Sequence, residues 1–180
     1  MAIQRGLVYT DHMAWMDIGL FRNLLQANLR PKEDRFSLEV PENFNSSYIG
    51  MSQVSSWQHV SKLSPWDYIR DNQVWVAGGV LLATKENMWK FSESYKLTVN
   101  ELVDEGMSST DQQVIGAMYS PRFIKRQQVQ IVTYTCQDGQ FGLYSSDVVY
   151  FCLGYICKDA AEKRLNASRT EQMNNLKQRH

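Results

Sequence analysis

Asp17 is the first residue whose type and position could support chemistry. It directly follows the apolar run 13–16 and stands two residues before Gly19. A carboxylate at the end of a strand can bind a hard divalent cation, which in turn can neutralise a diphosphate leaving group. The same carboxylate can instead accept backbone N–H groups and cap the following turn. Because glycine stands where the second carboxylate of an Asp-x-Asp pair would be, the sequence leaves both roles open.

Gly78, Gly79 and Asp111 are the other residues of this kind. The two glycines interrupt the apolar stretch 74–82, where a side chain would normally pack, and so predict a bulge or a close backbone approach. The approaching group could be the helix that begins near residue 85, or a bound ligand that a Cβ would displace. Asp111 opens a helical pattern, where the helix dipole alone favours an acid. A partly buried position there would also suit a general base.

Alternating strands and helices must position these residues. The run 13–16 is expected as a buried strand, and the apolar residues between 21 and 29 recur at helical spacing. A long charged loop should fill 31–47, and 48–60 alternates enough to hold one or two strands. The serine–proline pair at 64–65 is typical of a helix start.

The middle of the chain continues this alternation. The stretch 74–82 is the clearest strand, and the helix after it should begin at Thr84 and end at Gly106. Thr110 and Gln113 match a capping box, which predicts that the next helix begins at once.

The last part of the pattern is richer in strands. Residues 129–135 and 141–144 should pair through a tight turn, and the apolar run 147–156 should form a final strand. Strands that alternate with helices and then follow one another predict an α/β or α+β layered domain over residues 1–157, with a polar tail over 158–180. The expected core consists of Met13, Trp15, Leu24, Leu25, Val76, Val80, Leu82, Phe91, Leu102, Ile115, Val132, Val149 and Phe151.

Composition narrows the class of protein. Lys and Arg number 19, as do Asp and Glu, so the net charge of zero gives no electrostatic reason to expect nucleic acid or an anionic membrane as a partner. The sequence shows no signal-peptide pattern and no apolar run of membrane-spanning length, which favours an ordinary soluble domain. Its cysteines, at 136, 152 and 157, are expected as buried free thiols. Asn-x-Ser tripeptides begin at Asn45 and Asn166 and matter only in the secretory pathway, so the localisation stays open.

The blocks 14–23, 76–80 and 111–112, in this order, resemble the HtrL/YibB family. They are also similar to the blocks of glycosyltransferases with the GT-A fold, in which a metal-site aspartate, a glycine-rich strand and an Asp-Gln helix follow one another. The resemblance covers approximately residues 14–156. It rests on the ordered set, since each block alone is weakly specific.

The resemblance implies a partial GT-A-like fold, that is, an α/β domain whose mixed sheet is flanked by helices. It also implies a nucleotide-sugar donor, a glycan acceptor and a divalent cation, either manganese or magnesium. The implied roles are metal ligand for Asp17, catalytic base for Asp111, and substrate binding for Gly78, Gly79, Gln112 and Trp75.

The resemblance lacks one part of the GT-A pattern. The residues before Asp17 are too few for a nucleotide-binding βαβ half. We therefore expect either a glycosyltransferase-type enzyme or a non-catalytic remnant of that fold that binds a glycan or a protein. An incomplete sheet would leave room for a partner chain along its edge. We also expect no measurable transferase activity from the isolated chain.

Overall fold

The structure, a computed structural model, describes residues 6, 8–21, 37–142 and 147–177. At its centre lies a four-stranded mixed sheet with the strand order β1-β3-β2-β4. The strands are β1 (His12–Met16), β2 (Ile49–Gln53), β3 (Val76–Thr84) and β4 (Ile131–Tyr134). β3 pairs antiparallel with β1 and with β2, and β4 pairs parallel with β2.

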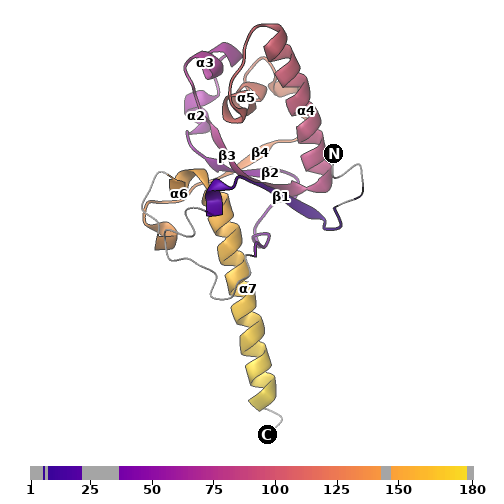
Figure 1. Cartoon of the computed structure of the whole chain (residues 1–180), viewed down its shortest axis with the longest axis vertical. Helices are drawn as coiled ribbons and strands as arrows, with labels where there is room; N and C mark the ends of the chain where they lie inside the picture. Colours follow the sequence, from indigo (N-terminus) through magenta and orange to yellow (C-terminus); the bar gives the residue numbers. More distant parts are fainter. Residues whose placement is uncertain (1–5, 7, 22–36, 143–146, 178–180) are drawn as a thin grey trace.

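Helices cover both faces of this sheet (Figure 1). One face carries α2 (Trp57–Val60), α3 (Pro65–Arg70), α4 (Lys85–Asp104) and α5 (Asp111–Met118). The other face carries α6 (Asp147–Tyr150) and α7 (Cys152–Lys177). Two short 3-10 helices, η1 (Ile124–Arg126) and η2 (Gln140–Gly142), lie in the connections. The α/β architecture predicted from the sequence, a mixed sheet flanked by helices, is therefore confirmed.

Each face of the sheet has its own hydrophobic core. The core beneath α4 and α5 contains Val76, Phe91 and Ile115, and the core beneath α6 and α7 contains Val80 and Phe151. All five were expected as core residues. Such a double core is the usual solution for a sheet whose two faces are both apolar.

Trp15 is the main exception to the expected core. Its side chain is 62% exposed, because β1 lies at the edge of the sheet and has β3 as its only strand neighbour among the described residues. The prediction that residues 13–16 form a strand is thus confirmed, but the prediction that this strand is buried is not. Met13, Val132 and Val149 are half-buried, and Leu24 and Leu25 lie outside the described residues.

Capping residues explain where several helices begin and end. Ser64 forms a complete capping box with Asp67 at the start of α3, and Thr84 accepts a hydrogen bond from the Asn87 backbone N–H at the start of α4. Gly106 follows α4 with a φ of +74°, a left-handed conformation that favours glycine. The capping box expected at Thr110 does not form, because its hydroxyl bonds to the side chain of Gln113 instead of the backbone.

β3 contains the bulge that its glycine pair predicted. Met51 of β2 pairs with Leu81, but the next residue, Ser52, pairs with Ala77, so residues 78–80 of β3 have no partners in β2. A Cβ on Gly78 would meet α5, whereas a Cβ on Gly79 would meet the junction of α6 and α7. The two glycines therefore serve opposite faces of the sheet.

The apolar run 147–156 is helical, and the prediction of a strand there was wrong. It forms α6 and the first turn of α7, and α7 continues through Lys177 across residues expected to be a polar tail. A short run that is apolar throughout fits a buried strand and a buried helix equally well, so its pattern could not decide. The stretch 48–60 likewise holds one strand and the short helix α2.

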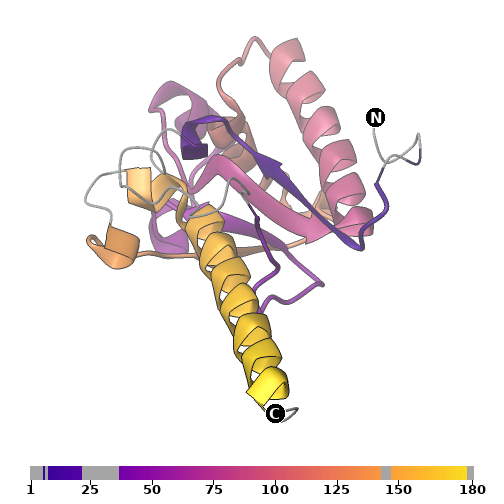
Figure 2. The same ribbon diagram turned by 60° about the horizontal axis from the view of Figure 1, so that its bottom comes forward.

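α7 extends well beyond the rest of the domain (Figure 2). Residues 162–175 are exposed on all sides of the helix. None of the helices in the described part of the chain combines the length and the apolar composition that a membrane span needs.

A disulfide joins Cys136, just after β4, to Cys152 at the start of α7. This overturns the expectation of three free thiols, since only Cys157 is free and buried. The hairpin expected after residue 135 is also wrong for its described part, because Phe141 lies in η2 with a φ of 62°. The disulfide links the end of the sheet at β4 to the first residue of α7.

Candidate functional site

Asp17, the glycine pair and Asp111 meet at one place in the fold. β1 runs antiparallel to β3, so the end of β1 lies beside the bulge near the start of β3. The Asp17 backbone N–H donates to the Gly79 carbonyl oxygen at 2.8 Å and so extends this ladder by one residue. On the other face, a Cβ on Gly78 would overlap Oδ2 of Asp111, so this carboxylate lies directly over the glycine. Three blocks that are far apart in the sequence therefore meet at the glycine pair of β3.

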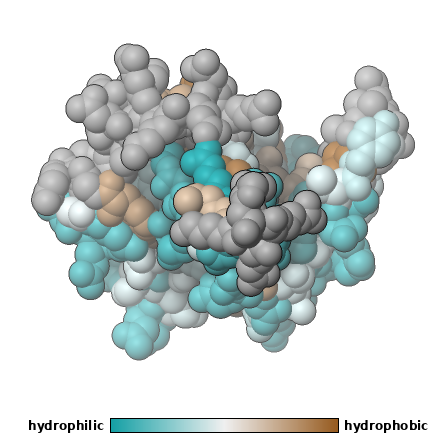
Figure 3. All heavy atoms as spheres, turned by 90° about the horizontal axis from the view of Figure 1, so that it is seen from below, coloured by the Kyte–Doolittle hydropathy of each residue, from teal (hydrophilic) through white to brown (hydrophobic). Residues whose placement is uncertain are grey.

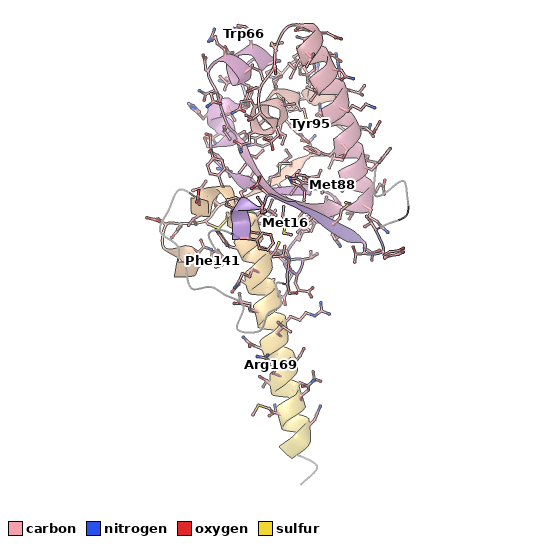
Figure 4. The ribbon with its side chains drawn as sticks, in the orientation of Figure 1. Met16, Trp66, Met88, Tyr95, Phe141 and Arg169 are labelled. Atoms are coloured by element: carbon pink, nitrogen blue, oxygen red, sulfur yellow. A yellow bond between two sulfur atoms is a disulfide. The ribbon has the colours of Figure 1, made fainter. Side chains whose placement is uncertain are left out.

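A groove of about 520 Å³ extends from this point between α4, α5 and the edge of the sheet. Its wall is mostly apolar, and the lining side chains that carry polar groups are Trp15, Ser92, Tyr95 and Asp111. The Ser92 hydroxyl already donates to the Met88 carbonyl oxygen at 2.7 Å. Figure 4 shows Met88 and Tyr95 on the side of α4 that faces this space. The lining residues are Met13, Ala14, Trp15, Leu81, Met88, Phe91, Ser92, Tyr95, Asp111 and Ile115.

Tyr95 and Asp111 also interact electrostatically. Burial raises the pKa of the Tyr95 phenol, and the negative charge of Asp111 raises it further. Tyr95 therefore keeps its proton at neutral pH and can donate a hydrogen bond, and the carboxylate oxygens of Asp111 offer acceptors. The groove therefore combines a hydrogen-bond donor at Tyr95, an acceptor at Asp111 and the exposed aromatic side chain of Trp15.

The side chain of Asp17 has the capping role that the sequence left open. Its Oδ1 accepts the Gly19 backbone N–H at 2.6 Å and closes the turn after β1. Gly19 is needed there, because a Cβ would approach the Phe151 ring to 2.9 Å. Asp17 thus joins the site through its backbone and shapes the turn with its carboxylate.

The donor set does not fit the divalent-cation site implied by the resemblance. Within the described residues, no three His, Cys, Asp or Glu side chains gather closely enough to hold a metal ion. One oxygen of Asp17 is already engaged by Gly19. We therefore derive no chemical step through a metal.

Trp75 and Gln112 stand apart from the groove. Trp75 is only 5% exposed and packs against Trp57 and Tyr119, with ring centroids 4.4 and 5.4 Å away, so it cannot stack on a ligand. The substrate-binding role implied for Trp75 is therefore corrected to a core role. Gln112 follows Asp111 on α5 and is half-buried, but it is not among the groove's lining residues.

Sequence reasoning missed Trp15 and Tyr95 as groove residues. Trp15 was assigned to the core, and Tyr95 was given no role beyond its place in the helix expected between Thr84 and Gly106. The signal that could have found them is the edge position of β1, which leaves part of the inner face of α4 uncovered. That position depends on strand order, which a hydrophobic pattern does not reveal.

A second groove, of about 590 Å³, lies at the opposite end of α4. Trp66, which is 50% exposed, and the Arg122–Glu105 ion pair contribute to its wall. Figure 4 shows Trp66 at the end of the molecule farthest from α7. This groove contains none of the residues to which the resemblance gives a role, so we do not take it as the principal site.

Comparison with protein-family models, curated proteins and solved structures finds no match for this chain. The candidate site therefore rests on its own geometry.

Proposed function

We propose that this domain is glycosyltransferase-like and binds a sugar unit in the groove between Trp15 and Asp111. The observation that supports this proposal is that Asp17 and Asp111 both lie against the glycine pair of β3, and that Asp111 also lines the groove. These are the elements of the ordered resemblance, and they come together in space although the two aspartates are 94 positions apart in the sequence. Asp17, Gly78 and Gly79 are not themselves among the groove's lining residues.

The groove's chemistry suits a sugar. One face of a pyranose ring is apolar and can stack on an exposed aromatic side chain such as Trp15. Its hydroxyl groups need both acceptors and donors, which Asp111 and Tyr95 supply. An apolar wall with a few converging polar groups is the usual form of a small-molecule site.

In the catalytic form of the proposal, Asp111 is the general base. The acceptor hydroxyl would attack the anomeric carbon of the donor sugar, the bond from that carbon to the leaving phosphate would break, and the hydroxyl proton would pass to Asp111. A carboxylate within reach of the attacking hydroxyl is the geometric requirement for this role. Asp111 is exposed at the groove and so accessible to an acceptor.

The second form of the proposal is a non-catalytic glycan-binding domain. The engagement of Asp17 by Gly19 favours it, because that carboxylate already has a structural task. Both forms require the same binding groove, and they differ only in whether Asp111 accepts a proton during transfer.

The test is a thermal-shift screen with nucleotide sugars and oligosaccharides, with and without manganese, followed by calorimetry and a product assay. A ligand present at a hundred times its Kd stabilises the native state by about 2.7 kcal/mol. In a domain of this size, each kcal/mol of stabilisation raises the Tm by roughly 2–4 °C. Asp111→Asn should abolish the shift, and Asp104→Asn, which changes an exposed acid at the far end of α4, should leave it intact.

The outcomes separate the two forms. Binding with product formation, both lost in Asp111→Asn, supports the enzyme. Binding without product supports the glycan-binding domain. If no sugar or nucleotide sugar binds to the wild-type chain, the proposed function is wrong in both forms.

A further inference from the structure

The Cys136–Cys152 disulfide indicates the environment in which this chain folds. The two Cα atoms are 5.5 Å apart, within the ordinary range for a bridged pair. Disulfides form and persist in oxidising compartments and are rare where glutathione and thioredoxin keep thiols reduced. The bond ties the segment after β4 to the helix that covers the α6–α7 face, so it belongs to the fold rather than to a loose terminus.

The third cysteine does not compete with this pair. Cys157 is buried, and burial raises the pKa of its thiol to about 12. Thiol–disulfide exchange requires a thiolate, which both the burial and the raised pKa of Cys157 disfavour.

Both Asn-x-Ser tripeptides lie on the surface of the folded chain. Asn45 is exposed, and its Oδ1 accepts the Ser47 backbone N–H at 3.0 Å. This bond holds the asparagine side chain beside the residue that carries the hydroxyl of the tripeptide. It uses Oδ1 and not Nδ2, the atom that carries a glycan, so the turn is compatible with a modified Asn45.

Asn166 lies on the part of α7 that projects from the domain, and both it and Ser168 are exposed. Seen from the end of α7, the described surface is largely hydrophilic (Figure 3). A bulky, solubilising modification is therefore accommodated without displacing packed side chains. Neither tripeptide contributes a residue to the groove that contains Asp111.

We propose that Asn45 and Asn166 are N-glycosylation sites and that the chain matures in an oxidising secretory compartment. In the modification, Nδ2 of the asparagine forms a bond to C1 of the first sugar of a lipid-linked oligosaccharide. The bond from C1 to the diphosphate breaks, the lipid diphosphate leaves with the electron pair, and the amide proton passes to a base of the transferase. The disulfide forms as the two thiols give up two electrons and two protons to a disulfide-bearing oxidoreductase.

The experiment uses the full chain isolated from the cells that produce it. The protein is alkylated without prior reduction and treated with peptide N-glycosidase in heavy-oxygen water, which converts each glycosylated asparagine to a labelled aspartate. Mass spectrometry of the peptides should show label at Asn45 and Asn166. It should show none at Asn100, an exposed helical asparagine outside any Asn-x-Ser sequence. Cys136 and Cys152 should remain unalkylated.

Matched variants at the third tripeptide position check that the label reports this modification. Ser168→Ala should remove the label at Asn166, whereas Ser168→Thr, which keeps a hydroxyl, should retain it. Label at only one asparagine would support that site and overturn the other. Absence of label at both asparagines would overturn the glycosylation, and alkylation of both Cys136 and Cys152 would overturn the oxidising compartment.

Discussion

Substitution by alanine should affect the stability of the fold differently at the two neighbouring glycines of the bulge. In Gly79→Ala, the new Cβ would lie 2.8 Å from Cε1 of Phe151 and 2.8 Å from the Tyr150 carbonyl oxygen. Real Cβ atoms do not approach other heavy atoms this closely, so something must move. The carbonyl belongs to the backbone at the α6–α7 junction and cannot rotate away. Overpacking of this kind typically costs about 1–3 kcal/mol of unfolding free energy.

Gly78→Ala meets a different obstacle. The nearest atoms to its Cβ all belong to the Asp111 carboxylate, which is the far end of an exposed side chain and can turn aside. The added methyl group also lowers the entropy of the unfolded chain, which alone stabilises by about 0.4–1 kcal/mol. We expect the unfolding free energy of Gly78→Ala to stay within about 1 kcal/mol of the wild type, while ligand binding in the groove weakens because Asp111 is displaced.

Urea unfolding followed by circular dichroism measures both variants. The wild type and the two variants should unfold with the same dependence on urea, so that midpoints compare directly. Equal stability of Gly79→Ala and the wild type would refute the packing of α6 and α7 against the bulge. A large destabilisation by Gly78→Ala would show that Asp111 is held more rigidly over the glycine than its exposure implies.

Three further predictions concern the stability of the fold. Phe91→Ala should lower the unfolding free energy by about 3–5 kcal/mol, because it leaves a cavity in the core. Val103→Ala, on the exposed side of the same helix, should change the unfolding free energy measured in urea by no more than about 0.5 kcal/mol. A reducing agent should lower the unfolding free energy of the wild type by about 3 kcal/mol, as expected for a bridge with a sequence separation of 16, and should leave a Cys136→Ala/Cys152→Ala variant unchanged. Burial raises the pKa of Cys157 from 9.0 to about 12, so the unfolded chain loses that proton first and stability should fall as the pH rises between these values. Cys157→Ala should make the unfolding free energy depend less steeply on pH in this range, and an unchanged slope would contradict the burial of the thiol.

Local signals in the sequence predicted the centre of the fold well. The strand around the glycine pair, the cap at Thr84 and the end of its helix at Gly106 all depend on interactions within a few residues. The position of Asp17 beside Gly79 depends on the antiparallel pairing of β1 with β3, and the position of Asp111 over Gly78 depends on the packing of α5 against the sheet.

The parts that the sequence predicted wrongly depend on distant contacts. The apolar run 147–156 is buried as a helix against one face of the sheet, and its periodicity does not differ from that of a buried strand. The disulfide was also missed, because the approach of Cys136 to Cys152 depends on how α7 packs against the sheet. The exposure of Trp15 depends on strand order, which is likewise set by the whole fold.

Methionine-methyl NMR tests the central claim, that the groove between Trp15 and Asp111 is a ligand site, most directly. Met13 and Met88 line the groove from β1 and α4, and Met173 lies exposed on α7 as an internal control. Titration with the sugar ligand that gives the largest thermal shift should move the Met13 and Met88 signals and leave Met173 in place, and Asp111→Asn should abolish these changes. If ligands from the full panel leave Met13 and Met88 as unmoved as Met173, the groove is not the binding site and the account is contradicted.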